Sequence, residues 1–538
     1  MMLSFFNNKK NLLTFIFFLT LFFLGYTIYD DYGISIDEDN TRINGFVSLK
    51  YLYDFFDINY NQFLESFPSI SEWEEKGIGF IFDLPTAFIE YQFQITDNRK
   101  YYLIRHFTNF LFFFIGTYYF FLLIKLRYRS TFVALTGTFL LLISPRIFAE
   151  SFYNNKDLIF LSLFIISTFY GIKFIENPSF KSSFLFALTA ALSIGIRVLG
   201  IVLPFIICLI LIIKFLRTGE DKKPIYKSFV FFLISFPIFT ILFYPYLWDN
   251  PLENFILIFT RLGDFPMGTF NFYFGSYVSS ENVPWHYSIV WIFITTPILY
   301  LLLFLIGFYL ISSRIIKRLL KIEKNDSLID LWRGNKELQD FIYLLILLVP
   351  IFSVIILNST LYDGWRHLYF VYPSFLMISL RTINFIEIKY FTKKRYMPCI
   401  IVLFLSLPTL MWMIKNHPYQ YVYFNNIVKK NFDKKFTMDY WGLSNVEAIN
   451  FILKENEGTI KIGKLSDTDI KLAKEFLPNN LRKRVQITEI KNSDFLINNF
   501  IFWEGTDKKR LGLIKNKFSV YHEIKVDGIS INTIYKKN

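Results

Sequence analysis

The sequence predicts an α-helical polytopic membrane protein with a small α/β domain at its C-terminal end. Of the 538 residues, 53% are hydrophobic and 20% aromatic, and the mean hydropathy is +0.37. A chain this apolar cannot cover its surface with polar groups, so lipid must solvate much of it. Apolar stretches long enough to cross a bilayer recur up to about residue 415, and the hydropathy falls beyond it.

The apolar stretches define the expected membrane spans. About 17–25 consecutive apolar residues can cross the hydrocarbon core. We expect about eleven spans, near 11–29, 101–125, 130–148, 157–175, 182–196, 198–216, 228–247, 288–312, 340–358, 367–388 and 397–415. Lys9 and Lys10 precede the first stretch, but no small-residue cleavage site follows it, so it is expected to be an uncleaved span rather than a signal peptide.

The basic residues predict the orientation of these spans. Lys and Arg concentrate in alternate loops, near 125–129, 222–227, 314–324 and 393–395. Such loops stay in the cytoplasm, which places the N-terminus inside and the C-terminus outside. The net charge of +13 is therefore an orientation signal, and no nucleic-acid partner is expected. Cys208 and Cys399 fall within or beside apolar stretches and define neither a disulfide framework nor a metal site.

Residues 1–415 are thus expected to form a transmembrane domain with two long exterior loops, 30–100 and 248–287. In the first, Phe46, Leu49, Tyr53 and Phe56 recur at helical spacing, and Pro85 is expected to open a second short helix that runs through Ile89. Such helices would lie along the membrane surface. The second loop is rich in aromatic residues and glycine.

Residues 416–538 are expected to form an exterior α/β domain. Strand patterns occur at 459–462, 484–490 and 529–535, and helical patterns at 446–454 and 468–476. The segment from Gly458 to Lys464 imitates a phosphate-binding loop, but Leu465 stands where a Mg²⁺-binding hydroxyl is required, and its middle reads as a strand. No ATP partner is expected.

An acidic cluster, Asp37, Glu38 and Asp39, follows the first span on the expected exterior side. Neighbouring carboxylates raise one another's pKa or recruit a cation, and either effect suits acid/base chemistry. The alternative is a solvated loop.

Other polar residues fall on the same expected side, at the ends of separate spans. They are Arg146, Lys156, Asp157, Arg197, Arg366 and His367. A shared exterior cavity with acidic and cationic groups suits a reaction in which an acceptor is deprotonated while an anionic leaving group departs. Arginine can bind phosphate through two parallel hydrogen bonds.

Each of these residues also has a structural interpretation. Asp157 could be an acid favoured at a helix N-terminus, and Arg197 could extend toward the membrane surface. Arg366 and His367 could anchor a span at the interface. His286 and His417 have no second His or Cys at metal spacing, so they are expected to be structural.

The order of these motifs resembles that of the GT-C glycosyltransferases over about residues 1–415. The similarity is greatest to the bacterial family-39, dolichyl-phosphate-mannose–protein mannosyltransferase-like enzymes, including the aminoarabinose transferases that act on lipid A. The segments that carry it are Ser35-Ile36-Asp37-Glu38, Arg105-His106, Ser144-Pro145-Arg146 through Asp157, Gly195-Ile196-Arg197 and Trp365-Arg366-His367.

This resemblance implies a multi-pass integral membrane enzyme of the bacterial inner membrane. It would transfer a sugar, with inversion, from a polyprenyl-phosphate donor to a protein, lipid or polysaccharide acceptor on the periplasmic face. Asp37 would be the general base, with Glu38 beside it, and Asp157 would orient a substrate. The donor phosphate would be held by Arg197, Arg366, His367, Lys156 and Arg146. No cofactor is required; a divalent metal serves some members, but no metal motif is present here.

Other functions are open at this stage. A transporter or a flippase for lipid-linked sugars would place ionisable residues near mid-membrane, often in two related halves. Here the span centres are nearly uncharged and no halves repeat. A non-catalytic assembly or polymer-export subunit, and an oligosaccharide ligase or polymerase, are the remaining alternatives.

Overall fold

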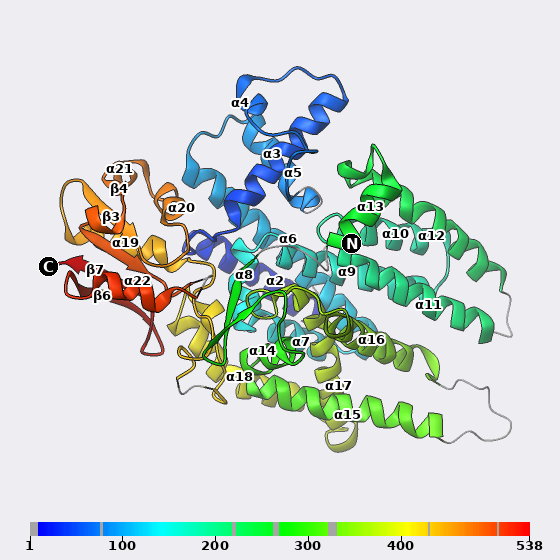
Figure 1. Cartoon of the computed structure of the whole chain (residues 1–538). Coiled ribbons are helices and arrows are strands. Elements are labelled where there is room, and N and C mark those ends of the chain that lie inside the picture. Colours follow the sequence, from blue (N-terminus) through cyan, green and yellow to red (C-terminus); the bar gives the residue numbers. More distant parts are fainter. Residues whose placement is uncertain are drawn as a thin grey trace.

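The computed structural model describes residues 9–75, 79–217, 222–261, 268–320, 331–428, 431–502 and 505–538. Its helices form one body, with the C-terminal α/β unit on one side and the helices of the first long loop projecting at another (Figure 1). The basic loop expected near 314–324 and the second exterior loop lie partly outside the described residues.

Within the described ranges, eight helices are long and apolar enough to cross a membrane. They are α2 (Lys9–Ile28), α6 (Asn98–Tyr128), α9 (Asp157–Glu176), the stretch Val198–Leu216 that includes η1 (Val198–Ile201) and most of α11 (Val202–Arg217), α12 (Lys223–Leu242), α15 (Ile298–Leu320), α16 (Gly334–Ile356) and α18 (Met397–Lys415). A ninth span is possible if α7 (Thr131–Leu142) and α8 (Pro145–Tyr153), bent by 68°, count as one. The prediction of a helical polytopic membrane protein is confirmed.

Besides the span expected at 130–148, which is the bent pair of α7 and α8, three of the eleven expected spans differ from a single long helix. The span expected at 182–196 is α10 (Phe180–Ile194), whose 15 residues extend about 22 Å, short of the roughly 30 Å core. The span expected at 288–312 is divided into α14 (Tyr287–Thr295) and α15, with Pro297 in the break, where it cannot continue a helix. The span expected at 367–388 is η3 (Arg366–Val371) followed by α17 (Tyr372–Tyr390).

The first long loop folds into α3 (Glu38–Phe55), α4 (Gln62–Glu65) and α5 (Phe80–Gln92). Phe46 and Leu49 are buried in one cluster between these helices, and Tyr53 packs against it, as their spacing predicted. Phe56 is the C-cap of α3 and is exposed, so it does not belong to the buried face. The prediction that Pro85 opens the second helix is wrong, because α5 begins five residues earlier and Pro85 lies inside it. Its N-cap is Gly79, whose φ of +83° suits glycine.

The second long loop contains α13 (Pro251–Arg261) and a two-stranded antiparallel hairpin, β1 (Phe270–Tyr273) and β2 (Ser276–Ser279), and η2 (Pro245–Leu247) directly precedes it. The hairpin contacts the segment that follows the last span: Tyr273 bridges to Phe436, and the Gly275 amide donates to the Lys435 carbonyl over 3.1 Å. This loop and the C-terminal segment therefore border the same region.

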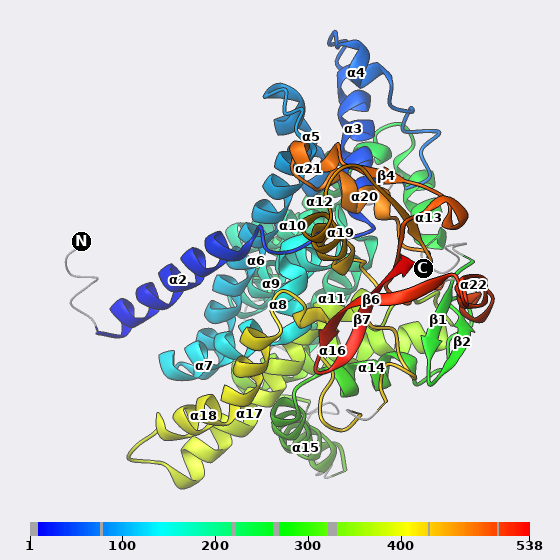
Figure 2. The same cartoon turned by 90° about the vertical axis from the view of Figure 1, so that its left-hand side faces the viewer.

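The C-terminal α/β unit contains a five-stranded mixed sheet, whose long strands β6 and β7 lie to the right of the centre in Figure 2. The strand order is β4 (Val485–Ile487), β3 (Ile460–Lys464), β5 (Phe495–Asn498), β7 (Ile529–Lys537) and β6 (Phe518–Val526). β3 runs parallel to β4 and β5, whereas β7 runs antiparallel to β5 and β6. Its helices are α19 (Ser444–Glu455), α20 (Ile470–Glu475), α21 (Asn479–Arg482) and α22 (Asp507–Ile514).

The strands and helices predicted for this unit are present, and the strand inside the apparent phosphate-binding loop is β3. β5, β6, α21 and α22 were not predicted. The unit also contacts the first loop: the Ile36 amide donates to the Trp441 carbonyl over 3.1 Å. A Cβ added to Gly33 would lie 2.3 Å from the Leu443 carbonyl oxygen, so the two backbones touch. The α/β unit is thus packed beside the acidic cluster.

Candidate functional site

The side chain of Arg366 joins two of the carboxylates singled out in the sequence. Its Nη1 lies 3.2 Å from Oδ2 of Asp37 and 3.4 Å from Oδ2 of Asp157. Asp37 is the N-cap of α3, Asp157 is the first residue of α9, and Arg366 begins η3. Only 2% of Arg366 is exposed, so this pairing takes place away from bulk water.

A second arginine completes the pairing of Asp157. Nη2 of Arg197 lies 2.6 Å from Oδ1 of Asp157, and the Asn154 side chain donates to the other oxygen over 3.0 Å. The position of Asp157 at the start of α9 also suits the helix dipole, so its structural interpretation holds together with the ion pairs. Arg197 is likewise paired rather than extended toward the membrane surface.

Aromatic rings surround the Arg366 guanidinium. Its central carbon lies 4.7 Å from the ring centre of Tyr362, 4.8 Å from that of Trp441 and 5.3 Å from that of Tyr440. The rings attract the cation and exclude water, which strengthens the electrostatic interactions of the centre. Tyr440 and Trp441 come from the segment that the sequence assigned to a separate exterior domain.

The electrostatics of the centre keep Asp37 ionised. Burial alone would raise the pKa of Asp37, but the charges of Arg366 and Lys156 outweigh burial and hold it below its ordinary value. At neutral pH the group is a carboxylate, able to accept a hydrogen bond or a proton.

Asp37 also faces a cavity of about 260 Å³. The cavity is bounded by the first loop, the β1–β2 hairpin, the segment before η3 and the C-terminal segment; its lining residues are Ile36, Asp37, Asn40, Thr269, Phe270, Asn271, Phe272, Tyr277, Tyr362, Thr437, Tyr440, Phe500, Ile501 and Phe502. The Asp37 side chain is 21% exposed. While Oδ2 contacts Arg366, Oδ1 has no protein partner among the described residues. One carboxylate thus connects a buried cation to an accessible space.

Glu38, expected to act beside Asp37, belongs to a different contact. Its carboxylate lies 2.8 Å from Nε2 of His106 and accepts the Ser35 amide over 2.7 Å, and the residue is buried. Asp39 accepts a hydrogen bond from the Tyr102 hydroxyl over 3.1 Å. The two acids that follow Asp37 therefore anchor α3 to neighbouring structure and do not join the Arg366 centre.

Lys156 lies near the centre without contacting either carboxylate of it. Its ammonium pairs with Glu75 at 2.9 Å. Burial would lower the pKa of Lys156, but Glu75 and Asp37 raise it above its ordinary value, so the group remains charged. Lys156 thereby adds positive potential near Asp37.

Arg146 and His367 lie around the centre and have no direct contact with Asp37 or Asp157 among the described contacts. The Arg146 guanidinium stacks over Phe424 at 5.0 Å and donates from Nε to the Tyr423 carbonyl over 3.3 Å. The His367 ring meets the Tyr362 ring edge-on, with centroids 4.6 Å apart. The structure thus groups Asp37, Asp157, Arg197 and Arg366 directly, and leaves the other four expected site residues in separate contacts.

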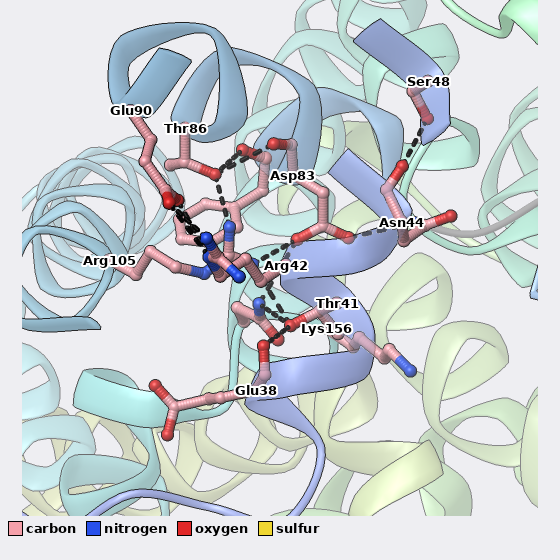
Figure 3. Close-up of polar contacts among 12 residues, drawn as sticks. Glu38, Thr41, Arg42, Asn44, Ser48, Asp83, Thr86, Glu90, Arg105 and Lys156 are labelled. Carbon is pink, nitrogen blue, oxygen red and sulfur yellow. Dashed lines mark hydrogen bonds and ion pairs between the residues drawn. The ribbon is translucent and has the colours of Figure 1, made fainter. Parts of the chain in front are cut away.

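A second buried acid, Asp83, was missed in the sequence (Figure 3). It is paired with Arg105 at 2.7 Å and accepts a hydrogen bond from Asn44 over 3.1 Å. Burial raises the pKa of Asp83 to about 6, against the opposing charge of Arg105. Asn155 donates to Thr41 over 2.8 Å and so ties this cluster to the turn before α9. A carboxylate inside the apolar sequence of α5 was the signal that could have found it.

Two more buried acids, Asp363 and Glu150, were not among the site residues predicted from the sequence. The Asp363 carboxyl faces Arg146 and Arg366, and its burial raises its pKa to about 6. Glu150, on α8, accepts hydrogen bonds from the Tyr369 hydroxyl over 2.6 Å and from Asn154 over 2.7 Å. Asp363 lies three positions before Arg366, and Glu150 lies between Arg146 and Lys156, so both are close in sequence to predicted site residues.

The donor set at Asp37 does not fit a divalent metal. Asp37 and Asp157 share Arg366, and the described residues contain no group of three or more His, Cys, Asp or Glu side chains placed to hold a metal ion. The positive charge that the two carboxylates face comes from arginine.

Several solved structures resemble this chain. A crystal structure of ArnT from Cupriavidus metallidurans in the apo state aligns over 96% of this chain and 96% of that one, with a TM-score of 0.44 and 10% sequence identity. No protein-family description and no curated protein sequence matches the chain.

Proposed function

We propose that the protein is an integral membrane glycosyltransferase that transfers a sugar, with inversion, from a polyprenyl-phosphate donor to an acceptor on the exterior face of the membrane. The observation that carries the proposal is the position of Asp37. The Asp37 side chain lines the cavity. One of its oxygens contacts the buried Arg366, and the other has no protein partner among the described residues.

In the proposed reaction, Asp37 accepts the proton of an acceptor hydroxyl as that oxygen attacks the anomeric carbon of the donor sugar. The bond between this carbon and the phosphate oxygen breaks on the opposite face, and the lipid phosphate leaves with the bonding electrons. Arg366 and Arg197 stabilise its charge, because guanidinium groups bind phosphate oxygens well in a site that excludes water. Asp157 orients both arginines through its two ion pairs.

The shared arginine also couples donor binding to the strength of the base. In the structure Arg366 lowers the pKa of Asp37, which makes the carboxylate a weak base. A donor phosphate that draws Arg366 toward itself weakens this contact, so the pKa of Asp37 rises. The base thus becomes stronger when the donor is in place.

The test is a transfer assay with purified full-length protein in lipid, a labelled polyprenyl-phosphate sugar and an extract of envelope acceptors. Asp37→Asn should lower the rate about 100- to 10,000-fold, because it removes a general base at nearly constant size. Asp54→Asn, an exposed change near the other end of α3, is the matched control and should keep full activity.

Undiminished transfer by Asp37→Asn would remove Asp37 as the base. Movement of the labelled lipid across the membrane without any transfer would identify a transporter or flippase instead.

A further inference from the structure

The walls of the cavity beside Asp37 are unusually aromatic. Seven of its fourteen lining residues are Phe or Tyr, contributed by the hairpin, the segment before η3 and the C-terminal segment. Its volume of about 260 Å³ is below the roughly 300–1,000 Å³ of pockets that hold drug-sized ligands. The space therefore fits a group about the size of one sugar ring.

Polar groups with free hydrogen-bonding capacity line the same cavity. Asn40 and Thr437 line the cavity, and their side chains form no hydrogen bond with any described residue. Oδ1 of Asp37 is similarly without a protein partner in the part of the chain that the structure describes. An amide, a hydroxyl and a carboxylate offer both donors and acceptors to a ligand that carries several hydroxyl groups.

Phe500 provides a second, independent observation. Its φ is +62°, a left-handed conformation that is costly for a phenylalanine, and its side chain is 38% exposed at the cavity. Residues held in such conformations cluster at ligand sites. The Phe500 amide donates to the Asn498 side chain over 2.9 Å, which holds this backbone at the end of β5.

From these features we infer that the cavity is the acceptor site, that the acceptor is a carbohydrate, and that one of its sugar rings stacks on Phe500. The inference rests on the proposed function, because Asp37, as the general base, must contact the acceptor hydroxyl. A sugar ring has apolar C–H faces and polar edges, which match aromatic walls with polar groups between them. The C-terminal α/β unit thereby supplies one wall of the active site.

The test measures sugar binding without transfer. Methyl glycosides of glucose, galactose, mannose and N-acetylglucosamine are offered one at a time to the full-length protein in lipid nanodiscs, and contact is recorded by saturation-transfer NMR. Phe500→Gly removes the ring, and because glycine adopts φ of +62° without strain, the substitution adds no backbone strain at this position.

Phe274→Gly is the matched control. Phe274 also has positive φ, +50°, and is 54% exposed, but it lies at the hairpin turn and does not line the cavity. We expect the wild type and Phe274→Gly to bind at least one glycoside equally, and Phe500→Gly to bind it about fivefold to tenfold more weakly, as the loss of an aromatic stacking contact implies.

Absence of binding by the wild type, or equal weakening by the two variants, overturns the carbohydrate site. In the transfer assay, Phe500→Gly should raise the KM for the acceptor and leave that for the donor unchanged; a change confined to the donor also overturns it. If the protein binds a glycoside but transfers no sugar, the proposed reaction is wrong and the sugar site stands. If Phe500→Gly leaves transfer unchanged, the sugar site is wrong and the proposed reaction stands.

Discussion

Replacing Arg366 by Gln tests whether the shared arginine holds the centre together. At 3.2 Å from Asp37 and 3.4 Å from Asp157, each Coulomb interaction amounts to about 5 kcal/mol at an effective dielectric constant of 20, before desolvation is subtracted. Removing one partner of a buried pair costs about 3–5 kcal/mol. Because Arg197 continues to pair with Asp157, Arg366→Gln leaves mainly Asp37 without its partner. We expect the free energy of unfolding to fall by about 3 kcal/mol.

The free energy of unfolding is measured in mixed micelles with a rising fraction of denaturing detergent. Arg510→Gln is the control, because the Arg510–Asp467 pair is partly exposed and should contribute about 0–1 kcal/mol. In an Asp37→Asn background, Arg366→Gln should cost less than in the wild type, with a coupling of about 1 kcal/mol or more. Two results would refute the shared-arginine reasoning. In the first, Arg366→Gln lowers the free energy of unfolding no more than the control does. In the second, its effect simply adds to that of Asp37→Asn.

Three further outcomes are expected. Because the pKa of Asp363 is about 6 in the folded protein, the folded state binds more protons than the unfolded state between about pH 4 and 6, and the contribution of Asp363 to stability falls as pH rises through that window. Asn tolerates the same φ of +49°, so Asp363→Asn should make the melting temperature depend less on pH between pH 4 and 7. An unchanged pH dependence would contradict this prediction. Gly79→Ala should destabilise more than Gly458→Ala, because both glycines have positive φ but only at Gly79 would the new Cβ lie 2.3 Å from the Asp83 carboxylate; equal melting temperatures would argue against that contact. Glu38→Gln should lower transfer less than tenfold in the proposed assay, since its carboxylate is outside the Arg366 centre, whereas a loss as large as that of Asp37→Asn would return Glu38 to the chemistry.

The spans and several ends of the helices could be read from the sequence because they depend on local composition. A run of apolar side chains favours helix in lipid wherever it stands in the chain, and α9 begins at Asp157 as a helix N-terminal acid predicts. The local rules failed where neighbours intervene. Pro85 was expected to start a helix, but α5 begins at Phe80, packs against α3 and includes Pro85 in its interior.

The candidate site could be predicted only as a set of residues on one side of the membrane. Glu38 follows Asp37 directly, and the sequence gives no means to separate them. At the start of a helix, successive side chains point about 100° apart, so one carboxylate meets Arg366 and the other meets His106. Which acid faces which cation is decided by the packing of α6 and η3 around α3.

What the sequence determined by itself was a helical membrane protein with an α/β unit at its C-terminal end and polar groups clustered at the ends of its spans, because hydropathy and periodicity are local properties. What only the tertiary structure decided was the pairing of Asp37 with Arg366, 329 positions apart, and the contribution of Tyr440, Trp441 and Phe500 to the surroundings of that pair. Such contacts depend on how distant segments pack, and no short stretch of sequence encodes them.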